Sequence, residues 1–189
     1  MPFRTDLSAT RRRVLTGLVG VTLAGGAGCL GTPAQQSPVP FDDGWSCDQC
    51  GMTISQQPGP VGQTYYADEP SLGHDGPARF CSSLCTYRHR FDTETRGWTP
   101  SVTYLTDYST VDYSVRSDGG RSVISPHPDA DALASTDELT IAAGTGLEGA
   151  MGPALVPFSD SADARTFAEE YGGSTLPATE VTRQLVSGR

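Results

Sequence analysis

The sequence predicts an α+β fold in which two β-β-α-β units follow one another, over residues 45–108 and 109–189. Three observations lead to this prediction. Each half contains one helix pattern with capping residues in front of it. Short strand-like segments lie before and after each helix pattern. The elements occur in the same order in both halves, although the halves share little sequence identity. We therefore expect small sheets, each packed with one helix.

In the first unit, a strand is predicted at residues 61–67, where two tyrosines and a valine favour extended backbone. The alternating pattern of residues 102–108 predicts a second strand. Between them a helix begins within residues 79–85, because Ser82 or Ser83 can serve as its N-cap. The apolar residues expected on one face of this helix are Leu84, Tyr87 and Phe91.

In the second unit, strands are predicted at residues 139–143 and 154–158. A Ser-Asp-Ser sequence then caps a helix over residues 162–171, which Gly172 and Gly173 bring to an end. Residues 180–185 are expected to form a last strand. The helix residues expected to be buried are Ala164, Phe167, Ala168 and Tyr171.

The N-terminal segment carries the features of an export signal. Residues 10–15 contain a twin-arginine pattern, and the apolar run at 18–23 is too short to remain as a membrane-spanning helix. Cys29 follows small residues and resembles the acceptor cysteine of a lipoprotein signal. We expect a twin-arginine lipoprotein signal over residues 1–28, then a lipid anchor and flexible tether over 29–44. Simple cleavage near the same place is the alternative. Either way, we expect the protein to work at the outer face of the cell membrane, having been exported by the twin-arginine route already folded.

The excess of acidic over basic residues restricts the functions that the protein can have. The chain has 13 basic and 22 acidic side chains, a formal net charge of −9, and every basic residue is arginine. An acidic surface of this kind repels phosphate backbones and is screened in concentrated salt. The composition is therefore haloarchaeal in type and argues against nucleic-acid binding.

Four cysteines besides Cys29 form two close pairs, Cys47-x2-Cys50 and Cys81-x3-Cys85. Such spacing can supply a tetrahedral thiolate site. If a helix begins by Cys81, the two cysteines of the second pair share one of its faces. In an oxidising compartment, one or two disulfides would also account for the pattern. A structural zinc knuckle is a third interpretation, so the cysteines alone leave the choice open.

The two internal methionines favour copper. Met52 and Met151 both lie in glycine-flanked turns rather than on apolar helix faces, and Met52 is two residues from Cys50. Thioether sulfur is a ligand for Cu(I) and rarely for zinc. His127 lies between two prolines and, like Cys47, is a candidate auxiliary ligand. His74 and His89 are expected to be surface residues.

Four stretches of the sequence, residues 47–52, 104–108, 149–158 and 164–173, resemble the NosL family, lipoproteins that act as copper chaperones in the maturation of nitrous oxide reductase. The resemblance implies paired β-β-α-β units and one bound Cu(I). It also implies a carrier rather than an enzyme, one that transfers copper to the apo-reductase and docks on an ABC-type membrane complex. By position, it implies Cys50, Met52 and Met151 as ligands.

The segment at residues 80–85 departs from that family pattern. Phe-Cys-Ser-Ser-Leu-Cys resembles instead a TRASH or YHS-type metal knuckle. Cys81 and Cys85 could hold a second metal, strengthen the thiolate site or form a disulfide. The rival functions are a zinc-stabilised cell-surface binding module and a CxxC thiol enzyme. Against the thiol enzyme, Cys47-x2-Cys50 does not begin an obvious long helix.

Overall fold

A computed structural model describes residues 36–67 and 72–188 of the chain. The predicted signal and Cys29 lie outside the described residues. The described residues belong to one unit of the chain, and both β-β-α-β motifs lie within it. The α+β prediction is confirmed: the structure combines small antiparallel sheets with a few helices. No helix among residues 36–67 and 72–188 has the length and apolarity to cross a bilayer.

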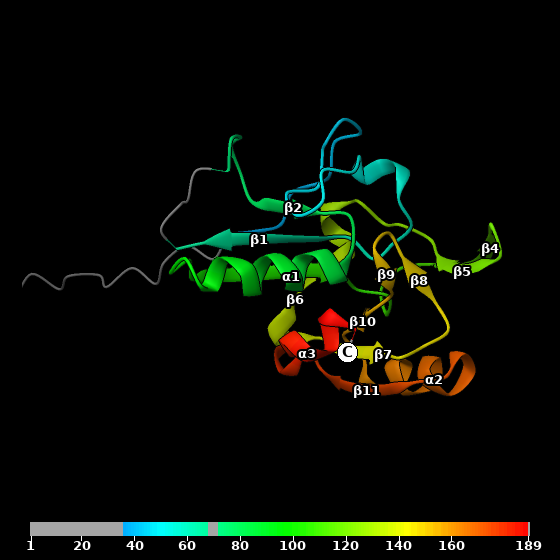
Figure 1. Cartoon of the computed structure of the whole chain (residues 1–189). Coiled ribbons are helices and arrows are strands. Elements are labelled where there is room, and N and C mark those ends of the chain that lie inside the picture. The colour runs from blue at the N-terminus through cyan, green and yellow to red at the C-terminus, as the bar shows by residue number, and fades with distance from the viewer. Residues whose placement is uncertain (1–35, 68–71, 189) are drawn as a thin grey trace, which may run out of the picture. The chain divides into compact units, whose positions relative to one another are not determined.

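The first sheet has four antiparallel strands in the order β2-β1-β3-β6. The chain forms two neighbouring strands, then a helix, and then the strand on the other side of β1, which is the predicted β-β-α-β order. Figure 1 shows α1 running alongside this sheet. The elements are β1 (Gly62–Tyr66), β2 (Ala78–Phe80), α1 (Ser83–Glu94), β3 (Pro100–Thr106) and β6 (Leu133–Ser135).

Helix α1 begins as predicted, with Ser82 as its N-cap. The Ser82 hydroxyl oxygen accepts a hydrogen bond from the Cys85 N–H at 3.1 Å, satisfying one of the free donors of the first turn. Leu84 and Tyr87 are buried and Phe91 is half-buried, so the predicted apolar face is the packed one.

The second sheet has three antiparallel strands in the order β10-β7-β11. Its topology repeats that of the first sheet, because the second strand of the motif lies on one side of the first strand and the last strand on the other. Helix α2 packs on this sheet and is capped by Asp160, whose carboxylate accepts from the Ala162 N–H at 2.7 Å. Within α2, Ala164, Phe167 and Ala168 are buried and Tyr171 is half-buried. The elements are β7 (Thr140–Ala143), β10 (Val156–Phe158), α2 (Ser161–Tyr171) and β11 (Ser174–Pro177).

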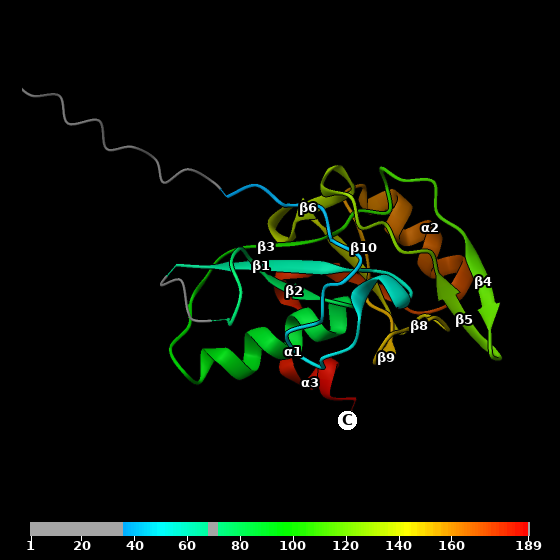
Figure 2. The same cartoon turned by 90° about the horizontal axis from the view of Figure 1, so that it is seen from above.

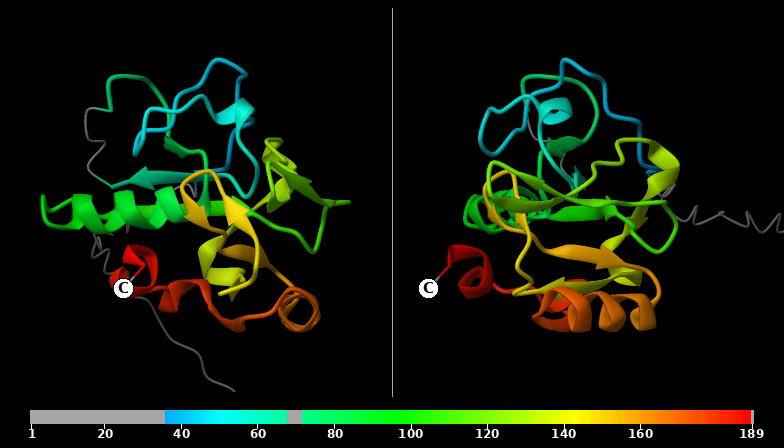
Figure 3. Two further views of the ribbon diagram at one scale, coloured as in Figure 1. Left: turned by 45° about the vertical axis from the view of Figure 1, so that its right-hand side comes forward. Right: turned by 90° about the vertical axis from the view of Figure 1, so that its right-hand side faces the viewer.

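Helix α1 also packs against residues of the second motif. Leu84 and Tyr87 share a buried cluster with Leu105 of β3 and Ile141 of β7. The Tyr87 hydroxyl donates to the Ala178 carbonyl oxygen at 2.9 Å. Figures 1 and 3 show α1 on the side of the first sheet that faces the second sheet, and α2 on the far side of the second sheet. The two motifs therefore share one core.

The strand predicted at residues 180–185 is wrong. Residues 178–180 form a 3-10 turn, and α3 (Arg183–Ser187) follows. The edge of β7 is already paired with β11, which comes directly after Gly172 and Gly173. Thr182 then caps α3 by accepting from the Leu185 N–H at 3.3 Å.

Two hairpins that the sequence did not predict extend from the sheets (Figure 2). The first joins β4 (Val115–Asp118) to β5 (Arg121–Ile124), and the second joins β8 (Glu148–Gly149) to β9 (Gly152–Pro153). The second hairpin places Met151 in its turn. Both hairpins are short, with little alternation to signal them.

The described part of the predicted tether is bound to the first sheet. The Tyr104 hydroxyl donates to the Gln36 carbonyl oxygen at 2.7 Å, and the Tyr65 hydroxyl donates to that of Ser37 at 2.9 Å. The Gln63 side chain on β1 also accepts from the Val39 N–H at 3.1 Å. From Gln36 onward the chain is therefore part of the folded unit rather than a free linker.

Candidate metal site

The four predicted cysteines meet at one point. Their sulfur atoms all lie within 4.8 Å of one another. Cys50 Sγ is 3.5 Å from Cys81 Sγ, which is 3.8 Å from Cys85 Sγ. A disulfide bond is about 2.05 Å long, and all four thiols are free. Of the interpretations that the spacing left open, the structure favours a single sulfur cluster over disulfides.

The first pair is presented by a tight turn. The Cys47 N–H donates to the Met52 carbonyl oxygen at 2.9 Å, and the Gly51 N–H donates back to the Cys47 carbonyl oxygen at 2.8 Å. Gly51 has a φ of 75°, a backbone conformation that glycine adopts without strain. This turn brings Cys47 and Cys50 to the same side of the loop.

The second pair joins a strand to a helix. Cys81 directly follows β2, and Cys85 lies in the first turn of α1, where unpaired N–H groups give a partial positive charge. Cys47, Cys81 and Cys85 are 3%, 0% and 1% exposed, whereas Cys50 is half-buried. Three of the four cysteines are therefore buried, and Cys50 is the member most accessible to solvent.

The thiols share their protons unequally. Hydrogen bonds with the thiols of Cys81 and Cys85 lower the pKa of Cys47 well below its ordinary value, although burial opposes this. The hydrogen bond with Cys47 raises the pKa of Cys81 and of Cys85, and burial adds to both shifts. One negative charge is thus easily held, whereas further charge in this buried space requires a cation.

Sequence reasoning missed the residues that support this cluster. The Asp48 carboxylate accepts from the Arg79 N–H at 2.7 Å and lies 3.0 Å from His74 Nε2. The Arg79 guanidinium in turn stacks on Trp45, 4.0 Å from the ring centroid. An aspartate between two cysteines carries no periodic signal, so only the fold reveals its contacts.

The two methionines belong to different parts of the chain, because Met52 follows the first cysteine pair directly and Met151 lies in the β8–β9 hairpin. Met52 is half-buried at the end of the first cysteine turn. Met151 is 39% exposed in the β8–β9 turn. That hairpin lies against the start of α1, because a Cβ built on Gly149 would be 3.7 Å from the Ser82 Cβ. The Met151 carbonyl oxygen accepts a hydrogen bond from the Arg88 guanidinium at 3.5 Å, which places the Met151 backbone beside α1, three residues beyond Cys85.

The three histidines have separate environments. His127 Nε2 lies 3.1 Å from Ser125 Oγ, and the His127 ring packs on Tyr108, so the structure does not bring it into the sulfur group. His74 is half-buried beside Asp48 rather than free on the surface. The expectation that His89 is a surface residue is wrong. It is 6% exposed on the inward face of α1, and its Nδ1 lies 2.8 Å from the Tyr66 hydroxyl.

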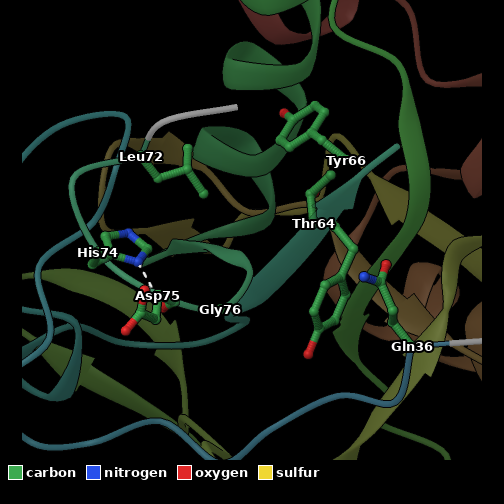
Figure 4. A pocket seen from close by; sticks show the side chains of 8 residues that line it. Gln36, Thr64, Tyr66, Leu72, His74, Asp75 and Gly76 are labelled. Carbon is green, nitrogen blue, oxygen red and sulfur yellow. Dashed lines mark hydrogen bonds between the residues drawn. The ribbon is translucent and has the colours of Figure 1, made fainter. Parts of the chain in front are cut away.

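A polar cavity of about 290 Å³ is lined in part by His74. Figure 4 shows the His74 ring directed toward Asp75, with Leu72 above it and Gln36 across the cavity. The walls carry hydroxyl, amide and carboxylate groups and no sulfur. This cavity is therefore separate from the cysteine cluster and offers none of its soft ligands. Its lining residues are Gln36, Thr64, Tyr65, Tyr66, Leu72, His74, Asp75 and Gly76.

An α+β fold that gathers four cysteines in one partly accessible cluster has the ligand set of a soft-metal-binding protein. The particular family follows from comparison with known proteins. The NosL family model matches residues 38–186, and the chain belongs to the NosL family.

Two relatives support this assignment. The chain is 32% identical over 155 residues to the copper-binding lipoprotein NosL of Stutzerimonas stutzeri, an alignment that covers 80% of this chain and 70% of that protein. It also matches the crystal structure of the copper chaperone NosL from Shewanella denitrificans with a TM-score of 0.59 and 25% identity. That match covers 80% of this chain and 98% of the other. The family resemblance found in the sequence is confirmed.

Proposed function

We propose that this protein carries Cu(I) outside the cytoplasmic membrane and delivers it for the maturation of nitrous oxide reductase. The observation that supports this most directly is the cluster of four free cysteines with one half-buried member, Cys50. Sulfur donors suit Cu(I), and membership of a family with copper-binding relatives points to the same cargo.

The cargo ion enters at Cys50. The Cys50 thiolate supplies the anchoring charge, and the thioethers of Met52 and Met151 serve as neutral donors at the exposed edge of the cluster. Cys47, Cys81 and Cys85 lie behind Cys50 as further sulfur donors, and the ion can move inward to them as Cys81 and Cys85 lose their protons. In this arrangement, His127 has no more than an auxiliary role. Weak thioether ligands at the edge allow the ion to move to a partner that offers another ligand, and no bond of a substrate has to be broken. The protein acts as a carrier rather than an enzyme.

The site of action follows from the N-terminal segment and the family. A lipid on Cys29 would hold the carrier at the outer face of the membrane, where tethering raises its effective concentration near membrane partners. Those partners are the apo-form of nitrous oxide reductase and its ABC-type assembly complex.

A zinc-stabilised binding module is the second candidate, and two sulfur–sulfur distances favour it. Four sulfurs bound tetrahedrally to one zinc ion at about 2.3 Å would lie about 3.8 Å apart. The observed separations of 3.5 and 3.8 Å are close to this spacing. In this alternative, all four cysteines are structural and removal of the metal unfolds the protein.

Metal binding under anaerobic conditions separates the two candidates. Purified protein is titrated with Cu(I) against a chromophoric chelator, and bound metal and free thiols are counted. We expect one tightly bound Cu(I), lost in Cys50→Ser and weakened in Met52→Ala and Met151→Ala. Retained zinc with no preference for Cu(I) and four protected thiols would establish the structural module instead.

A further inference from the structure

Asp48 lies between the two cysteines of the first pair and binds the segment that leads to the second pair. Its backbone N–H donates to the Arg79 carbonyl oxygen at 2.9 Å, and the Arg79 N–H donates back to Asp48 Oδ2 at 2.7 Å. Arg79 lies on β2, two residues before Cys81. One residue therefore connects the two chain segments that carry the sulfur atoms.

The Asp48 carboxylate is held in place from its other side by His74. His74 Nε2 lies 3.0 and 3.2 Å from the two carboxylate oxygens. The two side chains are only 15% and 19% exposed, so water competes weakly for these contacts. Hydrogen bonds to a charged group are roughly twice as strong as neutral ones, and a low local dielectric strengthens them further. The carboxylate is thus a fixed point rather than a mobile surface group.

We propose that Asp48 is a positioning residue of the metal site, which sets the separation of the two cysteine pairs before the metal arrives. Its hydrogen bonds go to Arg79 and His74 rather than to a sulfur, so it acts through the backbone that presents the ligands. Without it, ordering of the first cysteine turn would have to accompany metal binding, which weakens affinity. This inference rests on the proposed function, because it requires Cu(I) to occupy the four-sulfur cluster.

Gln49 provides a matched control within the same turn. Its side-chain amide donates to Asp92 Oδ2 on α1 at 3.1 Å, and this contact is exposed to solvent. Gln49 therefore resembles Asp48 in position and in having a long-range side-chain hydrogen bond. It differs from Asp48 because its side-chain hydrogen bond goes to α1 rather than to β2. Loss of its side chain should leave the cysteine separation unchanged.

The test compares Cu(I) affinity and copper–sulfur coordination in four proteins: wild type, Asp48→Ala, Asp48→Asn and Gln49→Ala. Outer-shell partners of metal ligands typically affect affinity about 10–100-fold, and we expect a loss of that size in Asp48→Ala. Asp48→Asn should recover most of the affinity, because an amide oxygen still accepts from the Arg79 N–H. X-ray absorption should show fewer sulfur neighbours per copper in Asp48→Ala only.

The possible results of this test distinguish the positioning role of Asp48 from the proposed carrier function on which it rests. An Asp48→Ala protein with wild-type affinity, or a Gln49→Ala protein weakened as much as Asp48→Ala, would overturn the positioning role while leaving the carrier intact. Failure of Asp48→Asn to recover affinity despite a wild-type melting temperature would overturn it too. A wild-type protein that binds no Cu(I) would overturn the proposed function itself.

Discussion

The protonation states of the cysteines in the cluster predict how the affinity for Cu(I) depends on pH. Cys81 and Cys85 have raised pKa values, so both keep their protons near neutral pH, whereas the Cys47 pKa is lowered and its proton is already lost. A thiol must lose its proton to bind a metal. If Cu(I) is held by the full cluster, binding releases at least the two protons of Cys81 and Cys85.

The expected magnitude follows directly. Each released proton strengthens binding by a factor of ten per pH unit, or about 1.4 kcal/mol. Between pH 6 and pH 8 the apparent affinity should therefore rise by at least about a hundredfold per pH unit, or roughly 2.7 kcal/mol. The assay is anaerobic competition with a chelator whose own pH dependence has been calibrated.

Two variants give this prediction its controls. Changing both Cys81 and Cys85 to serine should lower by two the number of protons released per Cu(I) bound, and the pH dependence of the affinity should become shallower accordingly. Met151→Ala should weaken binding equally at every pH, because a thioether has no proton to release. A wild-type slope of one proton or fewer, or an unchanged slope in the double variant, would show that Cu(I) does not use Cys81 and Cys85.

Three further predictions concern the folded unit. Burial lowers the pKa of His89, so the unfolded chain takes up a proton before the native protein does. The metal-free protein should lose stability below about pH 6.5, by at most about 1.4 kcal/mol per pH unit in urea titrations, and His89→Gln should flatten this loss. Buried Asp107 accepts from two backbone N–H groups, at 2.8 and 3.0 Å. Asp107→Ala should lower the free energy of unfolding by about 3 kcal/mol and Asp107→Asn by less; equal effects in denaturant unfolding would contradict the role of the side-chain oxygen. Because the Cys50 and Cys81 sulfurs are 3.5 Å apart, diamide should link them in the metal-free protein and not in the Cu(I)-loaded one, as peptide mapping would reveal.

Elements fixed by local chemistry were predictable from the sequence. Helix α2 has an aspartate cap in front and two glycines behind it, and both signals lie within the element itself. The segment at residues 180–185 contains a helix cap, Thr182, but whether this segment joins the sheet depends on β11, which already occupies the edge of β7. The short strand β2 escaped prediction for a similar reason, since three residues are too few to show alternation and its partner is β1.

The grouping of the four cysteines was predictable from the sequence, whereas the surroundings of the cluster were not. Cysteine spacing identified both pairs, yet only the tertiary fold distinguishes four converging thiols from disulfides. His127 looked well placed between prolines, but its neighbours Ser125 and Tyr108 determine where its ring lies. Asp48 gave no signal, because its partners lie 26 and 31 residues further along the chain.

Hydrogen bonds attach Gln36 and Ser37 to the first sheet, and they therefore limit the length of chain between Cys29 and the folded unit. Gln36 is the seventh residue after Cys29, and seven residues can span no more than about 25 Å even when fully extended. With a lipid on Cys29, as proposed, the folded unit would stay within about one domain diameter of the headgroups. Any protein that takes copper from it would therefore have to reach the carrier near the membrane surface.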